Sequence, residues 1–91
     1  MHVAIVHDTV GDADAPDARD VMVQADAVAR GLSVLHHSSC RMACTLNLAD
    51  LEVQLRRSRA ALVFNLVESI GGQGRLIHLL PFCLDALAVP Y

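Results

Sequence analysis

The sequence predicts a three-layer α/β domain in which strands and helices alternate in the order β-α-β-α-β-α. Two kinds of segment support this. Short apolar runs without alternation are typical of parallel strands buried on both faces, and longer segments between them carry apolar residues at helical spacing. The chain has 91 residues, of which 54% are hydrophobic, and a net charge of -3. We therefore expect residues 1–91 to form a single folded domain with a small core.

The first strand is expected at Val3 to Val6, where four apolar residues follow one another. A polar stretch from Asp8 to Asp17 is interrupted by glycine and proline and predicts a loop. From Asp17 to Leu32, apolar residues recur at the spacing of an amphipathic helix. Pro16 near the start and Gly31 near the end are typical of helix boundaries.

A second strand is expected at Ser33 to His37, near an edge of the sheet, followed by a mixed loop through Asn47. Asn47 is a residue type that caps helices, and Leu48, Leu51 and Leu55 then share one helical face. Arginines gather toward the end of this helix, where cations interact favourably with the helix dipole. The segment after Asn47 therefore predicts a second helix.

The third strand is expected at Ala61 to Phe64. A glycine-rich turn follows it, and helical spacing returns from Leu76 to Leu87. Pro81 interrupts this spacing, so that either it opens the main helix after an irregular first turn or the helix bends there. These short connections predict right-handed crossovers in a Rossmann-like domain with a short parallel sheet. The domain is expected to end before a fourth strand.

Composition argues against several kinds of partner. All seven basic residues are arginines, and they form no cluster beyond Arg56, Arg57 and Arg59, so nucleic-acid binding is not expected. Lysine usually contacts the phosphates in phosphoryl-transfer sites, and without it ATP chemistry is not expected to be complete in this chain. No apolar stretch approaches the ~20 residues of a membrane span, and the first residues lack signal-peptide features. We expect no membrane partner and a cytoplasmic location.

The loop after the third strand is the best candidate ligand site, because parallel sheets bind ligands beyond the carboxyl ends of their strands. Gly71, Gly72 and Gly74 would allow close approach of the main chain to a ligand, although they could simply turn the chain. Glu68 follows a buried strand and is the candidate functional carboxylate. Its alternative role is that of a solvated loop charge or a charge at a helix start. No residue is predicted to be catalytic.

Residue types that bind metals occur together in one window: His36, His37, Cys40 and Cys44. Adjacent histidines on a strand point to opposite faces, so at most one of the two could join both cysteines. A fourth ligand is therefore missing, and no metal is expected. The three cysteines are an odd number and predict reduced thiols. We expect His7 to make a loop hydrogen bond and His78 to have a structural role.

The run from Val63 to Gly72, continued by Ile77 and by the closing run from Ala86 to Tyr91, resembles the N-terminal domain of D-alanine–D-alanine ligases and their ATP-grasp relatives. The resemblance covers essentially the whole chain. It implies a three-domain ligase whose N-terminal lobe holds the first amino-acid substrate. ATP and magnesium bind to two later ATP-grasp lobes in that family, and both lobes are absent from this chain.

The chain departs from the family pattern at three places. His7 and Asp8 replace a glycine pair after the first strand, and Glu68 stands where the ligases have a histidine. The family glutamate that grips the substrate ammonium aligns near Ala18, with Asp17 and Asp20 as nearby carboxylates. These departures argue against D-alanine itself as the substrate, whereas another amino or carboxyl substrate still fits the pattern.

The resemblance implies an amino-acid-like small molecule whose ammonium group pairs with Glu68 or Asp17. The amides of Gly71 to Gly74 would line the pocket. Neither ATP nor magnesium is expected to bind to this chain alone.

Two functions stay open at this point. The chain is either the substrate-binding lobe of an ATP-dependent carboxylate–amine ligase, with the ATP-grasp lobes in cis or in trans, or a stand-alone metabolite-binding or regulatory module. As a lobe, it would be a domain fragment, a truncated gene product or one part of a split enzyme, and it is not expected to catalyse alone. A missing fourth strand would leave a sheet edge exposed, so a homo-oligomer is among the expected assemblies.

Overall fold

Strands and helices alternate along the chain in the computed structural model, which describes residues 1–9, 16–67 and 78–91. The elements are β1 (His2–Asp8), α1 (Pro16–Val34), β2 (Ser38–Cys44), α2 (Leu48–Ser58), β3 (Leu62–Asn65) and α3 (Leu79–Ala86). This confirms the predicted α/β class and the predicted order of the elements.

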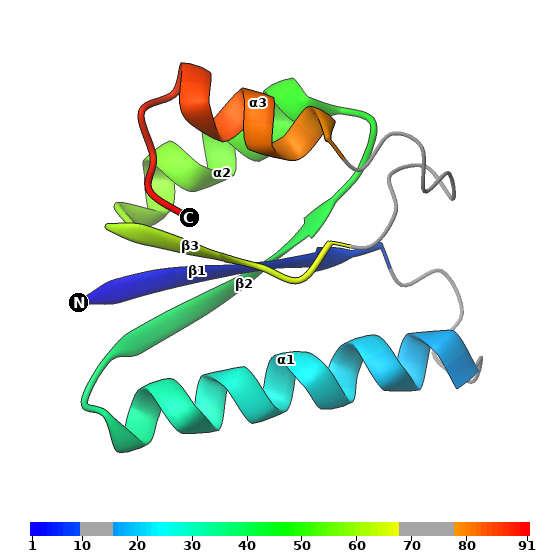
Figure 1. The fold of residues 1–91 in the computed structure, drawn as a ribbon, viewed down its shortest axis with the longest axis vertical. Helices are drawn as coiled ribbons and strands as arrows, with labels where there is room; N and C mark the ends of the chain where they lie inside the picture. Colours follow the sequence, from blue (N-terminus) through cyan, green and yellow to red (C-terminus); the bar gives the residue numbers. More distant parts are fainter. Residues whose placement is uncertain (10–15, 68–77) are drawn as a thin grey trace.

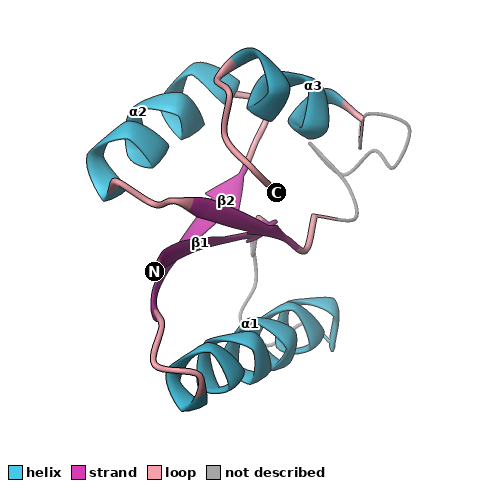
Figure 2. Cartoon of the chain, turned by 60° about the vertical axis from the view of Figure 1, so that its left-hand side comes forward, coloured by secondary structure: helices cyan, strands magenta, loops and turns pink. Residues whose placement is uncertain are grey.

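The strands form an open parallel sheet in the order β2-β1-β3. In the central strand, Ala4 pairs with Cys40 of β2 and with Val63 of β3. Residues Val3 to Val6 are at most 1% exposed, as expected for a strand covered on both faces. Helix α1 covers one face of the sheet, and α2 and α3 lie over the other (Figure 1; Figure 2). The resulting three layers are compatible with a small Rossmann-like unit.

The main core lies between the sheet and the pair of helices α2 and α3. Its buried members are Ala4, Val6, Met42, Cys44, Leu51, Leu55, Val63, Val67, Leu80 and Leu84. Successive side chains of a strand point to opposite faces, so Val3 and Ile5 of β1 face α1. On that helix, Ala25 is fully buried. Burial at 25 with partial burial at 21, 28 and 32 confirms part of the predicted apolar stripe, whereas Met22 at the same helical spacing is 42% exposed.

The position of the second strand corrects the prediction from sequence. The expected strand at Ser33 to His37 is wrong, because α1 continues through Gly31 to Val34. Strand β2 instead occupies Ser38–Cys44, which was expected to be loop. Met42 and Cys44 alternate with more exposed neighbours and are buried against α2 and α3. Most residues of this strand are small or contain sulfur, so the alternating pattern in the sequence was a weaker strand signal than that of a Val- and Ile-rich strand.

Helices α1 and α3 end in the same kind of turn, without glycine. After α1, His36 has a φ of 65°, and the His37 N–H donates to the Leu32 carbonyl at 2.8 Å. After α3, Ala88 has a φ of 57°, and the Val89 N–H donates to the Leu84 carbonyl at 3.0 Å. These bonds satisfy carbonyls that the helix leaves unpaired.

Helix α2 begins and ends with side-chain hydrogen bonds. Asn47 Oδ1 accepts from the Asp50 N–H at 3.0 Å, which confirms the predicted cap. At the other end, Arg59 has a φ of 56°, and the Ser58 hydroxyl lies between two backbone groups. It donates to the Leu55 carbonyl at 2.7 Å and accepts from the Ala60 N–H at 3.2 Å.

Helix α3 begins at Leu79, so Pro81 lies in its first turn. A proline there loses no helical hydrogen bond, because the first four N–H groups of a helix have no intrahelical partner. Pro81 is therefore accommodated at the start of the helix, in line with the first of the two predicted alternatives.

The last residues of the chain return to the outer edge of β3. The Val63 N–H donates to the Pro90 carbonyl at 2.8 Å, on the side of β3 that faces away from β1. Within the described residues, the sheet has three strands. None of the described helices is both long enough and apolar enough to cross a membrane.

Candidate functional site at the carboxyl ends of the strands

The carboxyl ends of the three strands meet at one edge of the sheet. The last residue of β1, Asp8, pairs in register with Cys44, the last residue of β2. On the other side, Val6 pairs with Asn65, the last residue of β3. The chain leaves this edge at Thr9 and again at Val67 (Figure 1).

The connections after the two neighbouring strands β1 and β3 lead to opposite faces of the sheet. Strand β1 is followed by α1 on one face, and β3 is followed by α3 on the other (Figure 1). In open α/β sheets, this reversal opens a crevice beyond the carboxyl ends, where ligands usually bind. The architecture thus places a candidate ligand site between the ends of β1 and β3.

Hydrogen bonds join the strand ends to one another. The Thr9 hydroxyl donates to the Cys44 carbonyl at 3.1 Å and so links the ends of β1 and β2. The Leu66 N–H donates to the Val6 carbonyl at 2.8 Å and links β3 to β1. Such bonds favour a preformed binding edge, since little ordering would be needed when a ligand binds.

Two polar side chains at this edge make local hydrogen bonds. The His7 Nδ1 donates to the Asp8 carbonyl at 2.8 Å, so the hydrogen bond expected for His7 is made within the end of β1 and not with the loop that follows. Asn65 Oδ1 accepts from the Val67 N–H at 2.9 Å. Neither Asn65 nor Thr9 had been predicted from the sequence to belong to this site. An asparagine directly after an apolar strand is the signal that could have identified this turn.

Cys44 lies beneath the edge and is 1% exposed. Burial, followed by the charge of Asp8 and the nearby Cys83 thiol, raises its pKa above the usual range. A thiol with a raised pKa stays protonated near neutral pH, and the protonated form is a poor nucleophile. Cys44 therefore fits a packing role.

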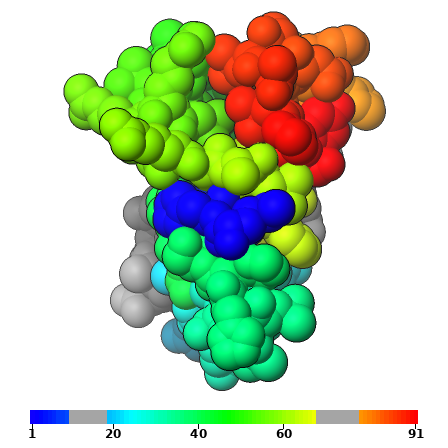
Figure 3. All heavy atoms as spheres, turned by 90° about the vertical axis from the view of Figure 1, so that its left-hand side faces the viewer, coloured from blue at the N-terminus to red at the C-terminus, as the bar shows by residue number. Residues whose placement is uncertain are grey.

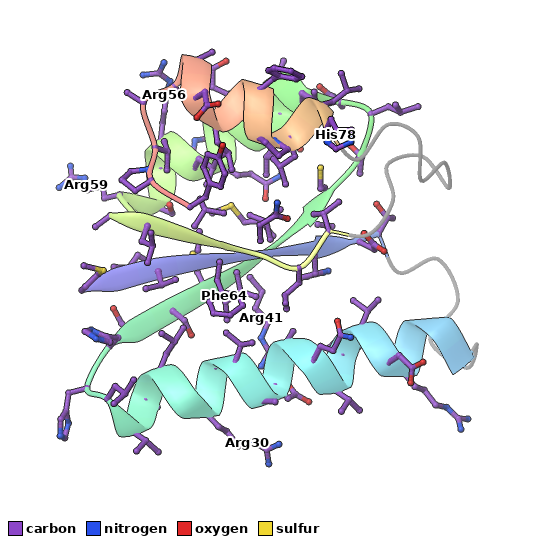
Figure 4. The ribbon with its side chains drawn as sticks, viewed as in Figure 1. Arg30, Arg41, Arg56, Arg59, Phe64 and His78 are labelled. Atoms are coloured by element: carbon purple, nitrogen blue, oxygen red, sulfur yellow. The ribbon has the colours of Figure 1, made fainter. Side chains whose placement is uncertain are left out.

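The predicted site residues lie around this edge or outside the described residues. Asp17 belongs to the first turn of α1, and its side chain is outside the described part of the structure. Glu68, Gly71, Gly72 and Gly74 lie in the segment 68–77, which is also outside the described residues. His78 is exposed directly before α3 and makes no side-chain cap (Figure 4). Its structural role stays a prediction.

The histidines and cysteines considered as metal ligands are spread along β2. His36 and His37 precede the strand, and Cys44 ends it. A strand of this length spans roughly 20 Å, so its two ends cannot share one ion. Among the residues that the structure describes, no group of three or more His, Cys, Asp or Glu side chains could hold a metal ion.

Comparisons with known proteins give no relative for this chain. No protein family, no curated protein and no solved structure matched it.

Proposed function

We propose that this chain is the substrate-binding lobe of an ATP-dependent carboxylate–amine ligase similar to the D-alanine–D-alanine ligases. The observation that carries the proposal lies between the parallel strands β1 and β3, whose carboxyl ends lie side by side and whose following connections lead to opposite faces of the sheet. The glycine-rich segment with Glu68 begins where β3 leaves this edge. The segment with the strongest resemblance to the ligases thus starts at the place where the fold favours a ligand.

The proposed substrate is an amino-acid-like small molecule. Its ammonium group pairs with Glu68 or with Asp17, whose helix begins at the same edge (Figure 1). The amides of Gly71, Gly72 and Gly74 line the pocket and receive the carboxylate, since exposed main-chain N–H groups bind anions. Among the groups at the edge, Asp8 adds negative charge, which favours a substrate ammonium over a second anion.

The proposed role leaves the phosphoryl transfer to other lobes. The chain contains no lysine, whereas nucleotide phosphates in phosphoryl-transfer sites are commonly held by one. ATP and magnesium would be bound by ATP-grasp lobes that act in cis or in trans. This chain alone is expected to bind the substrate but not to activate its carboxylate.

Equilibrium binding tests this proposal. We expect the chain to bind D-alanine or another small amino acid with a dissociation constant in the millimolar range, as is usual for so small a ligand. Glu68→Gln should weaken this binding about tenfold, because an ionised partner of the ammonium is lost. Glu52→Gln is the matched control, since Glu52 is the only other glutamate and pairs with Arg56 on α2. Its effect should be less than twofold.

Three outcomes would count against parts of this proposal. Micromolar binding of ATP by this chain alone, measured by calorimetry, would contradict the assignment of the nucleotide to other lobes. Equal affinity for amino acids in the Glu68→Gln variant and in its Glu52→Gln control would remove Glu68 from the site. Binding of a metabolite without an ammonium group would favour the stand-alone module.

A further inference from the structure

A second candidate site lies at the opposite end of the sheet, where the amino ends of the strands meet. A hollow of about 220 Å³ is lined there by Leu55, Arg56, Arg59, Ala60, Leu87 and Val89. It separates the end of α2 from the residues after α3, as seen between the yellow-green and red atoms in Figure 3. Its lining combines an apolar floor with two guanidinium groups.

The two arginines of the hollow differ in their partners. Arg56 Nη2 pairs with Glu52 Oε1 at 2.9 Å, one turn earlier on α2. Arg59 has neither an ion pair nor a side-chain hydrogen bond within the described part of the chain. Both side chains lie on the side of the molecule where the last residues return to β3 (Figure 4). The hollow therefore carries one positive charge that no described side chain neutralises.

Two turns shape this hollow, and both use residues with positive φ. Arg59 has a φ of 56° and Ala88 a φ of 57°. Glycine adopts this conformation with less strain, so an arginine at residue 59 is not the choice that local stability favours. The turn places Arg59 and Ala60 on one wall, and the turn at Ala88 places Leu87 and Val89 on the other.

We propose that this hollow binds a small organic carboxylate with an apolar body. Guanidinium groups match carboxylates in charge and in planar geometry, and the aliphatic side chains of Leu55, Leu87 and Val89 accept the apolar part. The volume of the hollow is roughly that of seven water molecules. It therefore suits a ligand whose apolar body has about six or seven non-hydrogen atoms. An inorganic anion would leave the apolar floor unused.

Hexanoate is a suitable probe, with acetate and 1-hexanol as matched ligands. Acetate keeps the charge without the apolar body, and 1-hexanol keeps the body without the charge. In ¹⁵N-labelled protein at low salt, we expect hexanoate to shift the amide signals of Ala60, Leu87 and Val89 with a millimolar dissociation constant. Acetate and 1-hexanol should bind at least about fivefold more weakly, since each makes only part of the contacts.

Variants of Arg59 separate binding from folding. Arg59→Gln should weaken hexanoate binding about three- to tenfold, the range for a partly exposed charge. Arg57→Gln is the matched control, because Arg57 is an exposed neighbour that does not line the hollow. Arg59→Gly should lose binding to the same extent while its melting temperature stays equal or rises, because glycine relieves the positive φ.

Several results would overturn the proposal. These are the absence of saturable shifts up to about 50 mM hexanoate, equal affinity for hexanoate and 1-hexanol or acetate, or equal losses in Arg57→Gln and Arg59→Gln. The site lies at the other end of the strands from the proposed substrate site, so the two sets of amide shifts are distinct. Failure of one proposal leaves the other intact.

Discussion

Ser58 connects the end of α2 to the chain that leads into β3, and its replacement by alanine tests this part of the fold. The hydroxyl donates to the Leu55 carbonyl and accepts from the Ala60 N–H. A typical hydrogen bond contributes about 1 kcal/mol net, and water can replace part of the loss at this half-buried turn. We expect Ser58→Ala to lower the free energy of unfolding by about 1–2 kcal/mol.

This loss is large for a domain of 91 residues, for which a total of roughly 5–14 kcal/mol is usual. Urea unfolding followed by circular dichroism should show a midpoint lowered by about 1 M. Ser33→Ala is the matched control, because Ser33 is exposed on α1 and its hydroxyl has no hydrogen bond within the described residues. Its effect should stay within about 0.5 kcal/mol.

The same variant has a chemical readout at Cys40. Burial raises the pKa of the Cys40 thiol, and its interaction with the Ser58 side chain partly lowers it. Ser58→Ala should therefore raise this pKa further and slow the alkylation of Cys40 by iodoacetamide at pH 8. Equal stability of the Ser58→Ala and Ser33→Ala variants, together with an unchanged alkylation rate, would refute this role of the hydroxyl.

Two further predictions concern the core and its thiols. Leu80 is fully buried, so Leu80→Ala should destabilise the domain by about 2–5 kcal/mol in thermal unfolding. Phe82→Ala is the control, since Phe82 is 71% exposed on the same helix and should change stability by less than about 0.5 kcal/mol. Because the pKa of Cys44 is raised in the folded domain, the unfolded chain loses this proton first as the pH rises, near the ordinary thiol pKa of about 9.0. Stability should thus be complete below that pH and fall as the pH rises above it. A Cys44→Ala variant with an equally steep decline would contradict this.

Most elements could be predicted because their patterns are strong. The four apolar residues of β1 have no polar alternation, and the structure buries all of them. Asn47 with leucines at helical spacing predicted α2, and the cap is present as a hydrogen bond. These local signals agree with the tertiary contacts, so little competes with them.

Strand β2 could not be recognised in the same way. Its core-facing side chains are Cys40, Met42 and Cys44, which are not strong strand formers. Gly31 also looked like the end of α1, whereas the helix continues beyond it and ends at a turn around His36. Packing against α2 and pairing with β1 decide the position of this strand, and neither is visible in a local window.

For the candidate site, the sequence predicted that the loops after the first and third strands leave from one edge of the sheet, but it did not indicate all of the polar groups there. The loops after the first and third strands do leave from adjacent strand ends. Thr9 and Asn65 were missed because their roles depend on hydrogen bonds to backbone groups. The hollow beside Arg59 could not be foreseen either, since residues 55–60 and 87–89 are far apart in the sequence and come together only in the folded chain.

The most direct measurement of the central claim is a map of amide shifts during titration of the ¹⁵N-labelled chain with D-alanine and other small amino acids. The proposed function predicts saturable shifts at Thr9, Asn65 and Val67, around the carboxyl ends of β1 and β3, and a loss of these shifts in Glu68→Gln. Shifts that cluster elsewhere, or none up to about 50 mM of any small amino acid, would contradict a substrate site at this edge.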